Sequence, residues 1–127
     1  MKIIDANIVL RYLLNDINDL ADKAALIIEN DDVLIPVEII AEIVYVLEKV
    51  YKVDRNDILS SLNGLTKYEN ICINEQEVVC SALKYYASLN LDFVDCLLLS
   101  YHSVKKFQVE TFDDKLRKHL ERIRNNE

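Results

Sequence analysis

The sequence predicts an α/β fold in which helices flank a mainly parallel sheet, within one domain that spans residues 1–127. Short apolar stretches alternate with longer stretches of helical periodicity, a pattern typical of strand-helix-strand crossovers. A single Gly and a single Pro exclude loop-dominated all-β chains and collagen-like chains. The length of 127 residues and the hydrophobic content of 51% allow one continuous core.

Four short stretches predict the strands, and longer amphipathic stretches between them predict the helices. The predicted strands are Ile3–Ile4, Val33–Pro36, Ile71–Ile73 and Phe107–Phe112. The predicted helices cover residues 8–14, 19–30, 37–51, 54–65, 75–88, 92–104 and 113–124. Their expected N-caps are Asn7, Asp19, Asp54 or Asn56, Asp92, and Asp114, because short polar side chains satisfy the free amides of a first turn.

Acidic residues gather where these elements meet. Asp5 ends the first predicted strand and Asp113 ends the last, so both should lie at the carboxyl edge of the sheet, where ligands of such sheets bind. Glu42 lies one turn into the helix that follows the second strand, and Asp92 and Asp95 share one face at the start of another helix. Converging carboxylates repel one another unless a hard cation such as Mg²⁺ or Mn²⁺ neutralises them.

Four segments carry a resemblance to the PIN-domain ribonucleases of the VapC toxin type. They are IIDAN, IPVEIIAEIVYVLEKVYKV, LDFVDCLLLSY and TFDDKL, and the resemblance as a whole covers nearly the entire chain. The resemblance implies a PIN-like domain and an endoribonuclease that hydrolyses RNA phosphodiester bonds with Mg²⁺ or Mn²⁺. Relatives often add a strand after the last helix, whereas this chain ends in RIRNNE, so we expect four strands and leave a fifth open.

The resemblance also assigns roles to individual residues. The implied metal ligands and catalytic residues are Asp5, Glu42, Asp95 and Asp113. Asp92 matches a position that is acidic in part of the family, and Thr111 matches a hydroxyl that helps to orient the site. The expected mechanism is metal-assisted hydrolysis by an activated water. The implied partners are an RNA substrate, a small antitoxin protein and a second copy of the chain in a homodimer.

Each carboxylate has a structural alternative. Asp5 could cap the first helix, although Asn7 is better placed for that. Glu42 shares a helical face with Glu38 and could be a solvated side chain. Asp95 could close a capping box, whereas Asp92 remains either a cap or a ligand.

Charge and composition limit the other possibilities. The net charge of -7 argues against a large basic footprint for nucleic acid. We interpret the basic residues of the last helix as a solvated face that complements the helix dipole; they are Lys115, Arg117, Lys118, Arg122 and Arg124. Three cysteines without a CxxC pair argue against a disulfide framework or a zinc site and suggest buried thiols. The absence of a leader pattern and of a long apolar run predicts a soluble, cytoplasmic protein without a membrane partner.

Two other functional classes remain as alternatives. A phosphoacceptor receiver domain needs an Asp at the end of its middle strand, which we place at Ile71–Ile73, and that strand is followed by Asn74 and Glu75. A catalytically silent interaction domain with the same fold would carry the same carboxylates as solvated groups.

Overall fold

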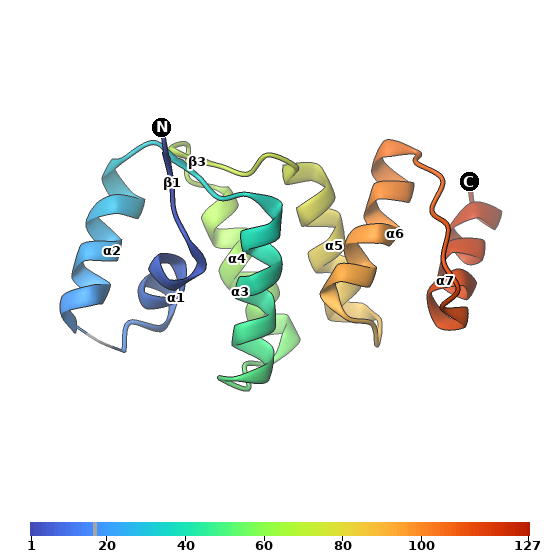
Figure 1. Ribbon diagram of the computed structural model, residues 1–127, viewed down its shortest axis with the longest axis horizontal. Coiled ribbons are helices and arrows are strands. Elements are labelled where there is room, and N and C mark those ends of the chain that lie inside the picture. The colour runs from blue at the N-terminus through green and yellow to red at the C-terminus, as the bar shows by residue number, and fades with distance from the viewer. Residues whose placement is uncertain (17) are drawn as a thin grey trace. The chain divides into compact units, whose positions relative to one another are not determined.

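The computed structural model describes residues 1–16 and 18–127, which form two compact units (Figure 1). The N-terminal unit comprises Met1–Gln76 and the C-terminal unit comprises Glu77–Glu127. The prediction that residues 1–127 form one domain stays a prediction.

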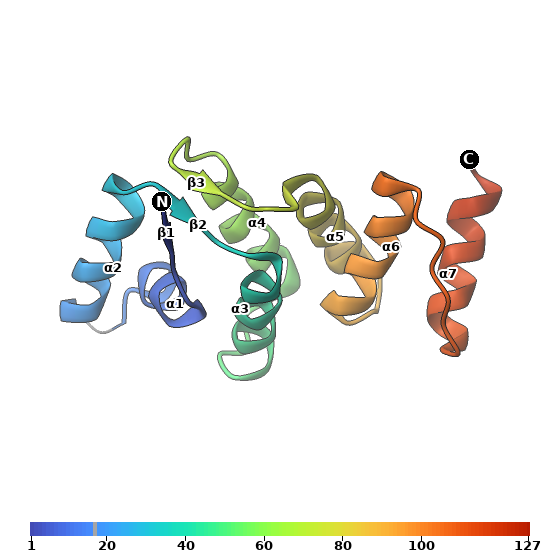
Figure 2. The same ribbon diagram turned by 45° about the horizontal axis from the view of Figure 1, so that its top comes forward.

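A small parallel sheet lies in the N-terminal unit. Its strands are β1 (Lys2–Ile3), β2 (Val33–Leu34) and β3 (Ile71–Cys72), in the order β1-β2-β3. Val33 pairs with Lys2 on one side and with Ile71 on the other, so β2 is the central strand. Val33 and Ile35 are fully buried, which explains why this stretch of the sequence is continuously apolar. Figure 2 shows β2 between β1 and β3.

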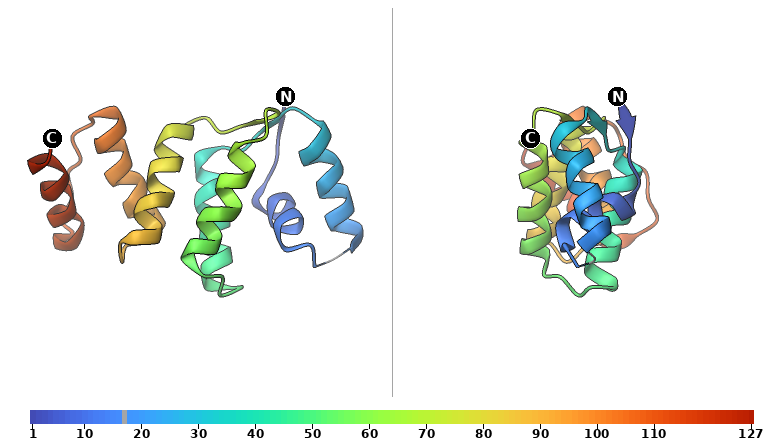
Figure 3. Two further views of the ribbon diagram at one scale, coloured as in Figure 1. Left: turned by 180° about the vertical axis from the view of Figure 1, so that it is seen from behind. Right: turned by 90° about the vertical axis from the view of Figure 1, so that its left-hand side faces the viewer.

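The helices of the N-terminal unit flank this sheet and confirm the predicted elements to within a few residues. They are α1 (Ala6–Leu14), α2 (Asn18–Asn30), α3 (Val37–Lys49) and α4 (Arg55–Thr66). Helix α1 packs against α2 and α3, and α3 packs against α4 (Figure 3). The buried face of α3 is the predicted one, with Ile40, Ile43, Val44 and Leu47 in the core. Asp19 lies inside the first turn of α2, so its expected role as an N-cap was wrong.

The C-terminal unit is helical in its described residues. It contains α5 (Gln76–Ser88, of which Gln76 belongs to the other unit), α6 (Phe93–Lys105) and α7 (Asp114–Asn125). The Tyr86 and Phe93 rings meet edge to face with centroids 5.8 Å apart, and the Ser100 hydroxyl donates to Ser81 Oγ at 2.9 Å. These contacts join α5 to α6, and α6 packs in turn against α7.

The predicted strand Phe107–Phe112 is not formed, so among the described residues the sheet has three strands instead of four or five. Among the described residues this stretch pairs with no strand, and a strand exists only where backbone groups exchange hydrogen bonds with a partner. Phe112 is fully exposed and Phe107 is 57% exposed. The aromatic residues at the two ends of the predicted strand therefore lie outside the core.

The structure also bears on the expectations about the cysteines and about membrane-spanning segments. Cys96 is buried, but Cys72 is exposed, so the interpretation of all three cysteines as buried thiols was wrong. In the part of the chain that the structure describes, every helix is too short or too polar to cross a bilayer.

Candidate metal centre

Asp5 stands at the junction of β1 and α1. Its backbone is extended, and its carboxylate Oδ1 accepts a hydrogen bond from the Ile8 amide at 3.1 Å. Asp5 is therefore the N-cap of α1, and the expectation that Asn7 fills this role was wrong, because the first helical turn begins at Ala6. The cap bond uses one carboxylate oxygen of an exposed side chain.

Glu42 is exposed in the second turn of α3. The N-cap residue of this helix is Pro36, whose ring cannot accept a hydrogen bond from the first turn. Asn74, which follows β3, supplies the acceptor instead, because its Oδ1 binds the Val37 amide at 3.0 Å. The end of β3 thus fixes the start of the helix that carries Glu42. Asp5 and Glu42 are the two predicted ligands in the N-terminal unit.

Asp92 and Asp95 lie at the start of α6 in the C-terminal unit. Asp92 is the N-cap residue of α6, as predicted, but its side chain makes no capping hydrogen bond and is exposed. Asp95 lies in the first turn and is half-buried between the buried residues Phe93 and Cys96. The apolar neighbours that the sequence places around Asp95 thus reduce its access to water.

Asp113 is the N-cap of α7, where we expected Asp114. Its carboxylate Oδ1 accepts from the Leu116 amide at 2.9 Å, whereas Asp114 lies inside the helix and forms an ion pair with Arg117 at 2.7 Å. The Thr111 hydroxyl accepts a hydrogen bond from the Asp113 amide at 3.0 Å. Thr111 therefore fixes the backbone just before Asp113, and its role in orienting a metal site stays a prediction.

The charges of the C-terminal unit meet at Asp95. Burial raises the pKa of the Asp95 carboxyl, and the nearby charges of Asp113 and Asp92 raise it further. The Lys115 ammonium acts on the same carboxyl in the opposite direction and lowers its pKa. The structure therefore brings Asp92, Asp95 and Asp113 into one electrostatic neighbourhood.

Lys115 is the residue that sequence reasoning missed, because we assigned it to a solvated face. Its ammonium donates to the carbonyl of Asn90, which ties the first turn of α7 to the residues just before α6. This bond links the segments that carry Asp113 and Asp95, which belong to different helices. The signal in the sequence was the position of Lys115 only two residues after Asp113.

The donor set fits a hard divalent cation in its chemistry. Carboxylate oxygens are the ligands that Mg²⁺ and Mn²⁺ prefer, and the charges of Asp113 and Asp92 add to burial in raising the pKa of Asp95. Among the residues that the structure describes, no three His, Cys, Asp or Glu side chains gather closely enough to enclose a metal ion. The prediction that Asp5, Glu42, Asp95 and Asp113 form one site stays a prediction.

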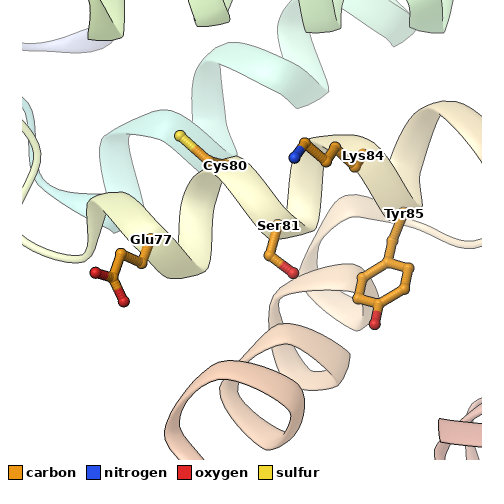
Figure 4. Close-up of a pocket in the computed structure, with 5 residues that line it drawn as sticks. All are labelled: Glu77, Cys80, Ser81, Lys84 and Tyr85. Carbon is orange, nitrogen blue, oxygen red and sulfur yellow. The ribbon is translucent and has the colours of Figure 1, made fainter. Parts of the chain in front are cut away.

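A pocket elsewhere in the C-terminal unit lacks this chemistry. It runs along α5 and is lined by Glu77, Cys80, Ser81, Lys84 and Tyr85 (Figure 4). A single carboxylate and a lysine lie among these residues, so the pocket offers no cluster of anionic oxygen ligands.

Comparison with known proteins identifies the family. The family model of the PIN domain matches residues 2–122, nearly the whole chain. The chain belongs to the PIN domain family. A VapC ribonuclease from Aquifex aeolicus (strain VF5) is 27% identical over 107 residues, which covers 76% of this chain and 75% of the relative. No solved structure gives a significant match.

The match confirms the resemblance drawn from the sequence. All four segments that carried it lie within the matched residues, and the PIN domain match includes residues of both compact units. Every acidic residue assigned to the site lies within the match as well.

Proposed function

We propose that this PIN domain protein is a metal-dependent endoribonuclease and the toxin of a toxin–antitoxin pair. The observation that carries the proposal is the half-buried Asp95, whose pKa is raised by burial and by the charges of Asp113 and Asp92. Membership of the PIN family supports a nuclease, and the similarity to a VapC ribonuclease supports RNA as the substrate.

The proposed ligands of Mg²⁺ or Mn²⁺ are Asp5, Glu42, Asp95 and Asp113, with Asp92 as a further candidate. A bound cation would lower the pKa of a water and offset the negative charge that develops on the phosphate oxygens. The caps at Asp5 and Asp113 hold these carboxylates in fixed orientations, because one oxygen of each is bound to a helix amide. The second oxygen of each stays available for a ligand.

Asp95 differs from these two exposed side chains, since burial opposes its charge and raises its pKa. A cation bound beside Asp95 would therefore favour its ionised form. Thr111 supports Asp113 through the bond to its amide.

The partners and setting follow from the same proposal. The substrate is RNA, a small antitoxin protein binds and blocks the site, and the active form is a homodimer in the cytoplasm. We further propose that the two compact units belong to one PIN domain, which is supported by a family match that spans residues 2–122.

The two alternatives to this proposal are a receiver domain and a silent interaction domain. In the described sheet the central strand is β2, not the stretch at Ile71–Ile73, and β2 is followed by Ile35 and Pro36 instead of an acceptor Asp. This disfavours a receiver domain. A silent interaction domain is favoured by one observation, namely that no three potential ligands are gathered within the described residues.

Cleavage of RNA by purified variants tests the proposal. We expect Asp95→Asn and Asp5→Asn to abolish cleavage of total RNA in Mn²⁺ and to abolish any growth inhibition, because each loses an anionic ligand. Asn retains the capping ability of Asp5, so the fold is preserved. Asp92→Asn should be milder, because the Asp92 side chain is exposed and makes no capping bond.

Asp114→Asn is the matched control, since it removes a neighbouring carboxylate that is paired with Arg117 and not assigned to the metal. It should cleave like wild type. Full activity of Asp95→Asn would overturn the site. A wild-type protein that cleaves no RNA and gains no thermal stability from Mn²⁺ would favour the silent domain.

A further inference from the structure

Helix α7 carries a continuous basic face. Lys115, Lys118 and Arg122 are separated by three and four residues, so they lie along one side of the helix. We call these three residues the basic stripe. All three side chains are exposed, while Leu116 and Leu120 form the buried side of the helix.

The stripe differs from the other basic residues of α7 in its partners. Arg117 is held by Asp114 at 2.7 Å and reaches Glu121 at 4.0 Å. In the described part of the chain, no carboxylate forms an ion pair with Lys118 or Arg122. These two cations are therefore available to an external anion.

His119 lies close enough to the stripe to be affected by its charge. It lies one turn from Lys115 and three residues from Arg122, and its pKa is lowered by burial and then by the charges of Arg122 and Lys115. The electrostatic potential at His119 is therefore made more positive by the stripe, although the chain as a whole carries a net charge of -7.

The position of the stripe indicates what it would bind. Its first member, Lys115, lies two residues after Asp113 and donates to the carbonyl of Asn90, two residues before Asp92, so the stripe begins beside the acidic residues of the C-terminal unit. From Lys115 to Arg122 it extends about 10 Å along the helix at 1.5 Å per residue. That length allows the stripe to contact more than one phosphate of the same strand.

We propose that the basic stripe of α7 binds the backbone phosphates of the RNA strand next to the bond that is cleaved. The proposal rests on the proposed ribonuclease function for the identity of the ligand. Lysine and arginine bind phosphate oxygens through charge-assisted hydrogen bonds. The carboxylates of the metal site alone would repel the phosphates of the substrate, and a row of basic residues beside them offsets this repulsion.

The experiment measures RNA binding by the full chain without cleavage. All proteins carry Asp95→Asn, and the probe is a fluorescent 20-nucleotide RNA of mixed sequence, followed by anisotropy over a series of KCl concentrations. The test variant is Lys118→Gln/Arg122→Gln. The control is Arg117→Gln/Arg124→Gln, which removes the same charge from another side of the same helix. Lys115 is left unchanged, because it contacts the acidic cluster.

We expect the test variant to bind roughly tenfold more weakly at low salt, with a salt slope reduced by about 1.4, since each lost phosphate contact on a single strand lowers the slope by about 0.7. The control should retain the affinity and slope of its parent. Equal losses in both variants would overturn the proposal in favour of bulk charge, and unchanged binding in the test variant would overturn it directly.

A polyglutamate peptide is the second probe, and it distinguishes an RNA ligand from an acidic protein partner. If the test variant no longer binds the peptide but still binds RNA, the stripe binds a protein and the proposal fails. Cleavage of RNA by the wild-type protein tests the proposed nuclease activity separately. Loss of RNA binding in the test variant, together with no cleavage by wild type, would support the stripe and reject the proposed ribonuclease.

Discussion

At the residue scale, Asp5 and Asp113 each combine a structural role with a proposed chemical one. The sequence singles both residues out, because each ends a predicted strand in an α/β pattern, and their role in a metal site stays a prediction. Their capping role was not predictable, since Asn7 and Asp114 are chemically equivalent candidates one or two residues away. Only the residue at which the first helical turn begins decides between them, and helix ends are the least predictable feature of a sequence.

Two substitutions of Asp113 separate the roles. Asp113→Ala removes the bond to the Leu116 amide and should cost about 1 kcal/mol of unfolding free energy, whereas Asp113→Asn keeps a capping oxygen and should not be destabilised in EDTA. Urea denaturation in EDTA measures both. Asp114→Ala is the control, because it loses only an exposed ion pair and should change little. An Asp113→Ala protein as stable as wild type would show that the cap contributes nothing.

At the element scale, the helices were predictable and one strand was not. Helical periodicity depends only on residues that are close together in the sequence, so the buried face of α3 could be predicted from its sequence alone. A strand depends on a partner that lies elsewhere in the chain, and apolar and polar residues can alternate without one. The exposed segment Phe107–Phe112 is such a case.

His119 on α7 gives this helix a predictable pH dependence. Its pKa is lowered by burial and by Arg122 and Lys115, so the folded protein binds the proton less tightly than the unfolded chain. The stability linked to His119 is therefore present above its unfolded pKa, about 6.5, and is lost as pH falls through the lower folded pKa. His119→Gln should lose less stability than wild type between about pH 7 and pH 5.

Urea midpoints of wild type and His119→Gln at a series of pH values measure this effect. Glutamine keeps a polar side chain of similar length but does not titrate. Parallel pH profiles for the two proteins would contradict the assignment of the lowered pKa to His119.

At the scale of the whole molecule, the order of the acidic segments was predictable and their assembly was not. The sequence indicated that Asp92, Asp95 and Asp113 belong together, and the structure brings these three into one electrostatic neighbourhood. Asp5 and Glu42 belong to the N-terminal unit, and their joint site with the others remains a proposal. The position of a side chain in three dimensions depends on packing between segments, which a motif does not specify.

One domain implies one cooperative unfolding transition. We expect a calorimetric scan of the full chain in EDTA to show a single peak whose calorimetric and van't Hoff enthalpies agree, because units that share a domain unfold together. Fluorescence and circular dichroism should give coincident midpoints. Two resolved peaks would show that residues 1–76 and 77–127 unfold independently, which would contradict the prediction of one domain.

The central claim is that the clustered carboxylates form a site for a divalent metal ion, and it can be tested without knowing which RNA is cut. The measurement is a set of four thermal melts near pH 7, with wild type and Asp95→Asn each in EDTA and in millimolar Mn²⁺. In EDTA, Asp95→Asn should melt higher by an amount on the order of 1 kcal/mol, because it removes a half-buried charge that lies near Asp113 and Asp92. In Mn²⁺ the order should reverse, because only wild type binds the ion well and gains stability by mass action. An Asp95→Asn protein that melts lower than wild type in EDTA, or a wild-type melting temperature that Mn²⁺ leaves unchanged, would contradict the account.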